Sequence, residues 1–148
     1  MNLKRIVHMT IPVTDCRRSE EFYTKVLGMK VVMRTPPALK YGMVFLRVGN
    51  DYLILTDSET PLNVRNDDNN LLHTAFAVES DEFDAALAEL EKAGVRVIAR
   101  DERPDGAFVG RSAYFHDPDR NVLEIVDLQY AVFRPLRDSP KPSSERHP

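Results

Sequence analysis

The chain has 148 residues, of which 43% are hydrophobic and 29% charged, a composition typical of one globular domain. No segment approaches the roughly 18 consecutive apolar residues that a membrane-spanning helix needs, so an integral membrane protein is not expected. The 20 basic and 23 acidic residues give a net charge of −3 without a basic stripe, which argues against a nucleic-acid partner. The single cysteine, Cys16, rules out an internal disulfide. A single cysteine fits a reducing compartment, and the N-terminal sequence shows no apolar core of a signal peptide. Both observations predict a cytoplasmic protein.

The first half of the chain is predicted to fold as a strand, a helix and three further strands. Apolar and polar residues alternate from the start, and Asp15 is placed to cap the helix that follows. Gly28 marks the end of that helix. The apolar residues expected on its buried stripe are Phe22, Val26 and Leu27. The predicted strands cover 4–14, 29–34, 41–49 and 52–57, and the predicted helix covers 15–27.

The second half repeats this order of elements. Its helix is strongly amphipathic and ends at Gly94. The apolar face of this helix carries Phe83, Leu87 and Leu90. The predicted strands cover 71–78, 95–100, 111–117 and 121–127, and the predicted helix covers 81–94. The repeat predicts an α+β fold of two tandem βαβββ modules.

The two modules are expected to form one domain. A polar segment rich in turn-forming residues separates them, and the C-terminal end is rich in proline and serine. We expect the C-terminal segment to be disordered. The predicted boundaries are a single domain over 4–130, modules over 4–57 and 71–127, a linker over 58–70 and a tail over 134–148.

Three residues at matching places in the repeat are candidate metal ligands. His8 and His73 open the first strand of each module, and both lie opposite the apolar residues that should pack on the helices. Glu124 lies within the apolar segment Val122–Val126, where an ionised carboxylate is costly unless it is paired or bound to a cation. Two imidazoles and one carboxylate form the facial triad that binds non-haem iron(II), and manganese, zinc or nickel also bind such sets.

The sequence resembles the vicinal oxygen chelate superfamily, which includes glyoxalase I, extradiol dioxygenases, fosfomycin-modifying enzymes and bleomycin-resistance proteins. The resemblance covers about residues 4–130, and its motifs are HMT (8–10), FYTKVLGM (22–29) and YFHDPDRNVLEIVD (114–127). It implies a curled mixed sheet that forms a cup around a metal held by His8, His73 and Glu124. It also implies a small substrate that chelates the metal, and a homodimer.

The resemblance also helps to discriminate among activities. Glyoxalase I carries a fourth protein ligand, a glutamate, on the last strand of its first module. Alignment of 52–57 with 122–127 places Ile54 opposite Glu124, so that ligand is missing here. The three remaining ligands would leave room for a chelating substrate and dioxygen at iron(II).

Three further residues are candidates for substrate handling. Tyr114 lies ten residues before Glu124, the spacing that extradiol dioxygenases show for an active-site tyrosine, and we expect it to be catalytic. Ser112 shares its face of the strand, and Thr10 matches a substrate-contacting threonine of fosfomycin-modifying enzymes. A packed tyrosine with a satisfied hydroxyl is an equal alternative for Tyr114.

These observations predict a metal-dependent enzyme, with an iron(II) ring-cleaving dioxygenase as the first choice. One alternative is a glyoxalase-like lyase or isomerase, or a fosfomycin-type thiol transferase. Basic residues that such transferases place after the ligand glutamate are delayed here to Arg134, which weakens the case for phosphonate binding. Another alternative is a metal-free drug- or metabolite-binding protein of the bleomycin-resistance type. A loop over 101–110 is a candidate lid over the cavity, or simply a long hairpin connection.

Overall fold

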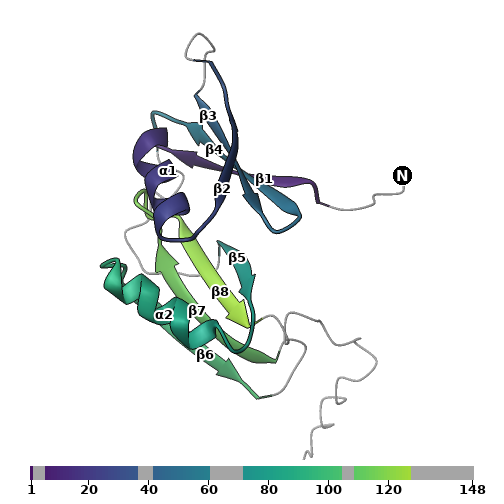
Figure 1. Cartoon of the computed structure of the whole chain (residues 1–148), viewed down its shortest axis with the longest axis vertical. Coiled ribbons are helices and arrows are strands. Elements are labelled where there is room, and N and C mark those ends of the chain that lie inside the picture. The colour runs from purple at the N-terminus through teal and green to yellow at the C-terminus, as the bar shows by residue number, and fades with distance from the viewer. Residues whose placement is uncertain (2–5, 37–41, 61–71, 105–108, 128–148) are drawn as a thin grey trace, which may run out of the picture.

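A computed structural model of the chain shows two βαβββ modules in tandem, and it describes residues 1, 6–36, 42–60, 72–104 and 109–127 (Figure 1). The first module contains β1 (His8–Val13), α1 (Cys16–Lys25), β2 (Lys30–Arg34), β3 (Met43–Val48) and β4 (Asp51–Asp57). The second contains β5 (His73–Val78), α2 (Phe83–Lys92), β6 (Val97–Arg103), β7 (Gly110–His116) and β8 (Val122–Asp127). The predicted order of elements is confirmed, whereas the tail over 134–148 and most of the linker lie outside the described residues.

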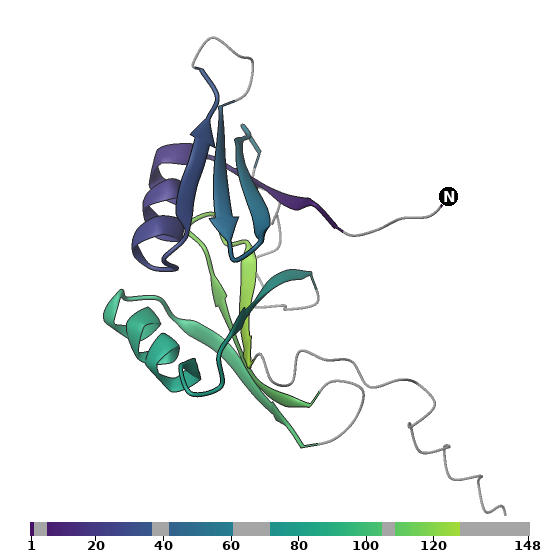
Figure 2. The same ribbon diagram turned by 45° about the vertical axis from the view of Figure 1, so that its right-hand side comes forward.

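Each module forms its own four-stranded mixed sheet. The strand orders are β1-β4-β3-β2 and β5-β8-β7-β6, with the first pair of each sheet parallel and the other pairs antiparallel. Both helices lie on the same side of the two sheets (Figure 2). The opposite faces of the sheets carry His8, His73 and Glu124.

The hydrophobic core lies between the sheets and the helices, as the alternation of apolar residues predicts. Phe83, Leu87 and Leu90 of α2 are all buried, which confirms the predicted face of that helix. In α1 the most buried residues are Ser19 and Tyr23. The expected stripe of Phe22, Val26 and Leu27 is only partly buried against the core.

The ends of the helices agree with the sequence. The Asp15 carboxylate accepts hydrogen bonds from the backbone N–H groups of Arg17 and Arg18, as an N-cap does. Gly28 and Gly94 have φ angles of 68° and 74°, in the left-handed region that favours glycine where a helix ends.

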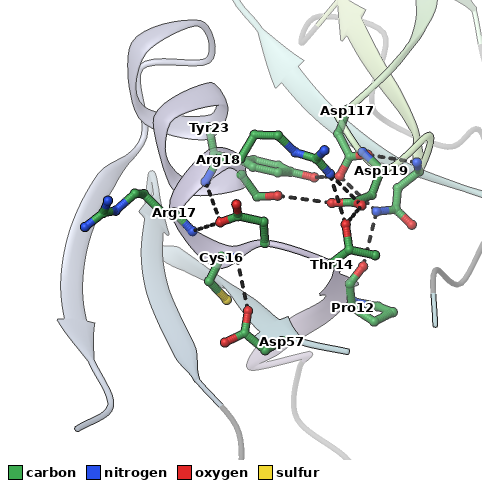
Figure 3. A network of polar contacts seen from close by, with 12 residues as sticks. Pro12, Thr14, Cys16, Arg17, Arg18, Tyr23, Asp57, Asp117 and Asp119 are labelled. Carbon is green, nitrogen blue, oxygen red and sulfur yellow. Dashed lines mark hydrogen bonds and ion pairs between the residues drawn. The ribbon is translucent and has the colours of Figure 1, made fainter. Parts of the chain in front are cut away.

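Ser19 and Tyr23 are buried because a polar network joins α1 to the turn between β7 and β8 (Figure 3). The Tyr23 hydroxyl donates to Asp117 over 3.0 Å, and the Arg18 guanidinium donates to Asp119 over 2.7 Å. Thr14 and Ser19 also donate to Asp119. The network therefore fixes the turn before β8, the strand that carries Glu124, against the first module.

We expect the substitution Asp119→Asn to lower the free energy of unfolding by about 1–3 kcal/mol at neutral pH, because it removes a charged acceptor and leaves the buried Ser19 hydroxyl poorly paired. Burial opposes ionisation of Asp119, but the hydrogen bonds from Thr14 and Arg18 outweigh it and lower the pKa of the carboxyl below 3.8. A lowered pKa stabilises the folded state above the unfolded-state pKa and is lost as the pH falls through the folded-state pKa. The stability difference between wild type and variant should therefore be constant above about pH 5 and shrink below about pH 4.

Urea titrations at several pH values measure this difference. The exposed Asp81→Asn is a control, and it should change the free energy of unfolding by less than about 0.5 kcal/mol. A difference for Asp119→Asn that grows on acidification would contradict the role given to this carboxylate.

The candidate lid is shorter than predicted. Residues 101–103 belong to β6, which pairs with β7 as far as Arg103 and Gly110, whereas 105–108 lie outside the described residues. Within the described part of the chain, no helix combines the length and the apolar character needed to cross a membrane.

Candidate metal and substrate site

Four predicted site residues lie together on the face of the second sheet that is turned away from the helices, called the inner face below. Glu124 of β8 lies opposite Tyr114 of β7 in the antiparallel register, and cross-strand partners point to the same face. Ser112 lies two residues before Tyr114 and therefore shares this face. His73 opens β5, the strand on the other side of β8.

Glu124 and His73 are in direct contact. The distance between His73 Nε2 and Glu124 Oε2 is 2.9 Å, and the Glu124 side chain is only 6% exposed. A carboxylate buried in an apolar strand is costly unless a cation or hydrogen-bond donors compensate for it. Imidazole nitrogen and carboxylate oxygen are both donors that divalent transition metals accept, so this pair fits part of a metal centre.

Tyr114 lies next to this pair. Its ring meets the His73 ring edge to face, with 5.3 Å between the ring centroids. Burial raises the pKa of Tyr114, and a hydrogen bond to Glu124 adds to the rise, while Arg103 and Ser112 oppose it. The phenol is therefore protonated at neutral pH and available as a hydrogen-bond donor.

Arg103 is a site residue that the sequence analysis missed. Its Nη2 donates to the Tyr114 hydroxyl over 3.1 Å, and its Nη1 donates to Ser112 Oγ over 3.3 Å. The predicted strand ended at residue 100, which left Arg103 in a loop. The pairing of β6 with β7 places Asp101 and Arg103 on the face of Ser112 and Tyr114, whereas the four consecutive charged residues 100–103 show no alternation that predicts a strand.

The first sheet carries the remaining predicted residues. His8 and Thr10 are exposed on β1, and the described residues contain no group of three or more side chains able to hold a metal ion. Hence one chain joins His73 to Glu124 but does not bring His8 to them. His8 instead borders a groove of about 670 Å³ that also contacts the edge strand β5.

The register of the two sheets supports the assignment of Ile54 as the counterpart of Glu124. Ile54 of β4 pairs with Thr10, two residues after His8, and Glu124 of β8 pairs with Ala75, two residues after His73. Ile54 is buried, with 8% of its surface exposed. An aliphatic side chain therefore occupies the place where a fourth carboxylate ligand was considered.

The Glyoxalase/Bleomycin resistance protein/Dioxygenase superfamily model matches residues 5–125. The chain belongs to this superfamily. It is 29% identical over 123 residues to glutathione transferase FosA of Serratia marcescens, covering 83% of this chain and 80% of that protein. It is 30% identical over 129 residues to metallothiol transferase FosB of Lysinibacillus sphaericus, covering 84% and 82% of the two chains.

A solved superfamily structure shows the same architecture. Lactoylglutathione lyase of Agrobacterium tumefaciens superposes with a TM-score of 0.65 at 25% identity, covering 86% of this chain and 96% of that one. The vicinal oxygen chelate resemblance and the two-module fold are thus confirmed. These relatives are transferases and a lyase, so they favour the second predicted activity class and give the dioxygenase and iron(II) no support.

Proposed function

We propose that the chain is a metal-dependent thiol transferase of the fosfomycin-modifying type, with His8, His73 and Glu124 as its metal ligands. The observation that carries this proposal is the contact of the buried Glu124 with His73 beside Tyr114, with Ile54 at the position of a fourth ligand. The similarity to FosA and FosB supports transfer. A glyoxalase-like lyase is the second candidate, supported by the lyase neighbour and weakened by Ile54.

We also propose that the site forms between two copies of the chain, so that His8 of one copy joins His73 and Glu124 of the other. β1 and β5 each lie at one edge of their sheet, and large apolar side chains near them are exposed. These side chains are Ile6, Val7, Met9 and Leu72. Exposed apolar residues on an open strand edge are suited to pairing with another chain.

The residues of the site support a simple division of roles. A bound divalent cation would supply Lewis-acid polarisation of a substrate oxygen. In thiol transfer to an oxygenated carbon, the thiol loses its proton, a carbon–sulfur bond forms, a carbon–oxygen bond breaks, and the released oxygen takes up a proton. Tyr114 accepts a hydrogen bond from Arg103, whose guanidinium can only donate, so the phenol proton points to an acceptor such as Glu124 or a substrate oxygen. We assign Tyr114 the role of proton or hydrogen-bond donor to that oxygen.

Metal analysis and a panel of substrates test the proposal. Protein purified from cells should contain one divalent cation per chain, and the loaded protein should consume glutathione or cysteine in the presence of fosfomycin. Isomerisation of the methylglyoxal–glutathione hemithioacetal would establish the lyase instead. Ring opening of catechols in air would contradict the transferase and indicate a dioxygenase. A chain that holds no metal after reconstitution would refute the metal-dependent enzyme.

The variant Tyr114→Phe should lower kcat by about 100-fold with unchanged metal content, because it removes a hydroxyl donor and keeps the ring. Equal kcat values for wild type and Tyr114→Phe would assign the tyrosine a packing role.

A further inference from the structure

A groove between the two modules lies apart from the candidate metal site. It has a volume of about 680 Å³, and residues of both modules line it. Small-molecule sites in proteins typically have volumes of about 300–1,000 Å³. The groove reaches β8 at Ile125, a residue of the hydrophobic core, whereas the preceding Glu124 points to the opposite, inner face of the sheet. A ligand in this groove would therefore not contact the metal ligands.

Apolar side chains of both modules line the groove. Leu90 of α2 and Ile125 of β8 are buried, and Phe76 of β5 is partly buried against the same core. Val26 and Leu27, which follow α1, contribute from the first module. A hydrocarbon chain bound here would be withdrawn from water, and each buried methylene group strengthens such binding by about fourfold.

Two cations of the first module lie side by side at this groove. Lys30 of β2 and Arg47 of β3 are cross-strand partners, and both line the groove. Like charges directly opposite each other in a sheet are destabilising. Among the residues that the structure describes, neither side chain has an ion pair or a hydrogen bond. The fold gains nothing from this pair, whereas an anion bound between the two side chains would remove their repulsion.

The wall that α2 contributes has the opposite charge. Glu82 and Glu89 line the groove from this helix, and the exposed Ala85 lies between them in the sequence. An anionic group is repelled by these two carboxylates and attracted by Lys30 and Arg47. The charges thus determine at which wall an anionic group binds, and the apolar lining remains for the rest of the ligand.

We propose that this groove binds an amphipathic anion of the fatty-acid class, with its carboxylate at Lys30 and Arg47 and its hydrocarbon chain over Phe76 and Leu90. Lysine and arginine donate charge-assisted hydrogen bonds to a carboxylate, which are about twice as strong as neutral ones. The site is additional to the metal centre, and it does not depend on the proposed function.

Titration of octanoate into the full, metal-free chain tests this site, with Kd obtained by calorimetry or by amide chemical shifts. Octanol, acetate and ω-aminooctanoate are compared with it. Octanoate should bind at least about tenfold more tightly than octanol, which lacks the charge, and acetate, which lacks the chain. ω-Aminooctanoate should bind more weakly than octanoate because an ammonium group replaces its apolar end.

Two variants examine the two parts of the site. Arg47→Gln should weaken octanoate binding by about tenfold, since it removes a charged donor. Ala85→Trp should weaken it by at least about tenfold, because the larger side chain fills the groove. Ala85 lines this groove and not the one beside His8, so its effect distinguishes the two.

Each variant has a matched control. Arg17→Gln removes a cation near the start of α1, away from the residues that line the groove, and Ala88→Trp introduces the same bulky side chain three residues beyond Ala85 on α2. Both controls should leave Kd unchanged. All four substituted residues are exposed, so thermal unfolding should show that every variant is folded.

Any of three binding results overturns the inference: a wild type that does not bind octanoate, octanol or ω-aminooctanoate bound at least as tightly as octanoate, or wild-type affinity in Arg47→Gln or Ala85→Trp. Sedimentation of Ala85→Trp adds one more test. Its oligomeric state should equal that of the wild type, and dissociation would show instead that a second copy covers the groove. These results are independent of metal content, so they leave the proposed function unaffected.

Discussion

Replacement of Glu124 by glutamine should abolish stoichiometric metal binding, with an affinity at least about 100-fold below that of the wild type, as even outer partners of metal ligands contribute about 10- to 100-fold. Glutamine keeps the shape of the side chain and removes the charge that a divalent cation requires. Glu124 is 5% exposed and contacts His73 and Tyr114, and a glutamine oxygen can still accept hydrogen bonds from both. The same substitution should therefore leave the melting temperature of the metal-free protein close to that of the wild type.

Two measurements separate metal binding from folding stability. Metal content after dialysis against a buffered divalent cation measures metal binding, and thermal unfolding in chelator measures the stability of the metal-free protein. The exposed Glu102→Gln, on β6, is a control that should leave both unchanged. Full metal content in Glu124→Gln would contradict the assignment of this residue as a ligand, and a large loss of melting temperature would indicate that the carboxylate is needed for folding.

Most of the fold follows from local patterns that the sequence carries. The alternation around Ile11 and Val13 and the spacing of Phe83, Leu87 and Leu90 identify the buried faces because burial of apolar surface requires them. Asp15 and Gly28 define the first helix by capping chemistry. The repeat then predicts the topology, since each βαβββ unit covers one sheet with one helix.

The structure differs from the predicted elements where residues far apart in the sequence determine burial or strand length. The buried face of α1 includes Ser19 and Tyr23 because Asp117 and Asp119, about 100 residues away, supply their hydrogen-bond partners. β6 extends to Arg103 because the partner strand β7 continues to Gly110, and a polar strand end shows no apolar alternation. Sequence-based reasoning about single elements does not contain these long-range partners.

The sequence predicted part of the candidate site, namely the residues on the second sheet. His73, Glu124, Tyr114 and Ser112 come together as expected because the hydrogen-bond register of one sheet aligns them. His8 stays apart because it belongs to the other sheet, and a sequence does not specify which copy of a chain supplies each strand to a shared site. Met9 shares the face of the buried Ile11 and Val13 but is 45% exposed in the single chain.

Loss of the His8 imidazole should also have a large effect on metal binding. His8→Ala should eliminate metal binding as completely as Glu124→Gln, although His8 is exposed in the single chain and contributes little to the stability of that chain. This combination is expected only if a second copy completes the site. The variant should unfold at the wild-type temperature in chelator.

Complementation between two inactive variants tests the shared site most directly. Chains carrying His8→Ala and chains carrying Glu124→Ala, each with a different tag, are coexpressed, and the dimer containing both is isolated. If His8 of one copy joins His73 and Glu124 of the other, one of the two sites retains all three ligands and the other loses two. A shared site predicts one metal ion per mixed dimer, against two in the wild-type dimer and none in either parent, whereas a mixed dimer without metal would contradict a shared site.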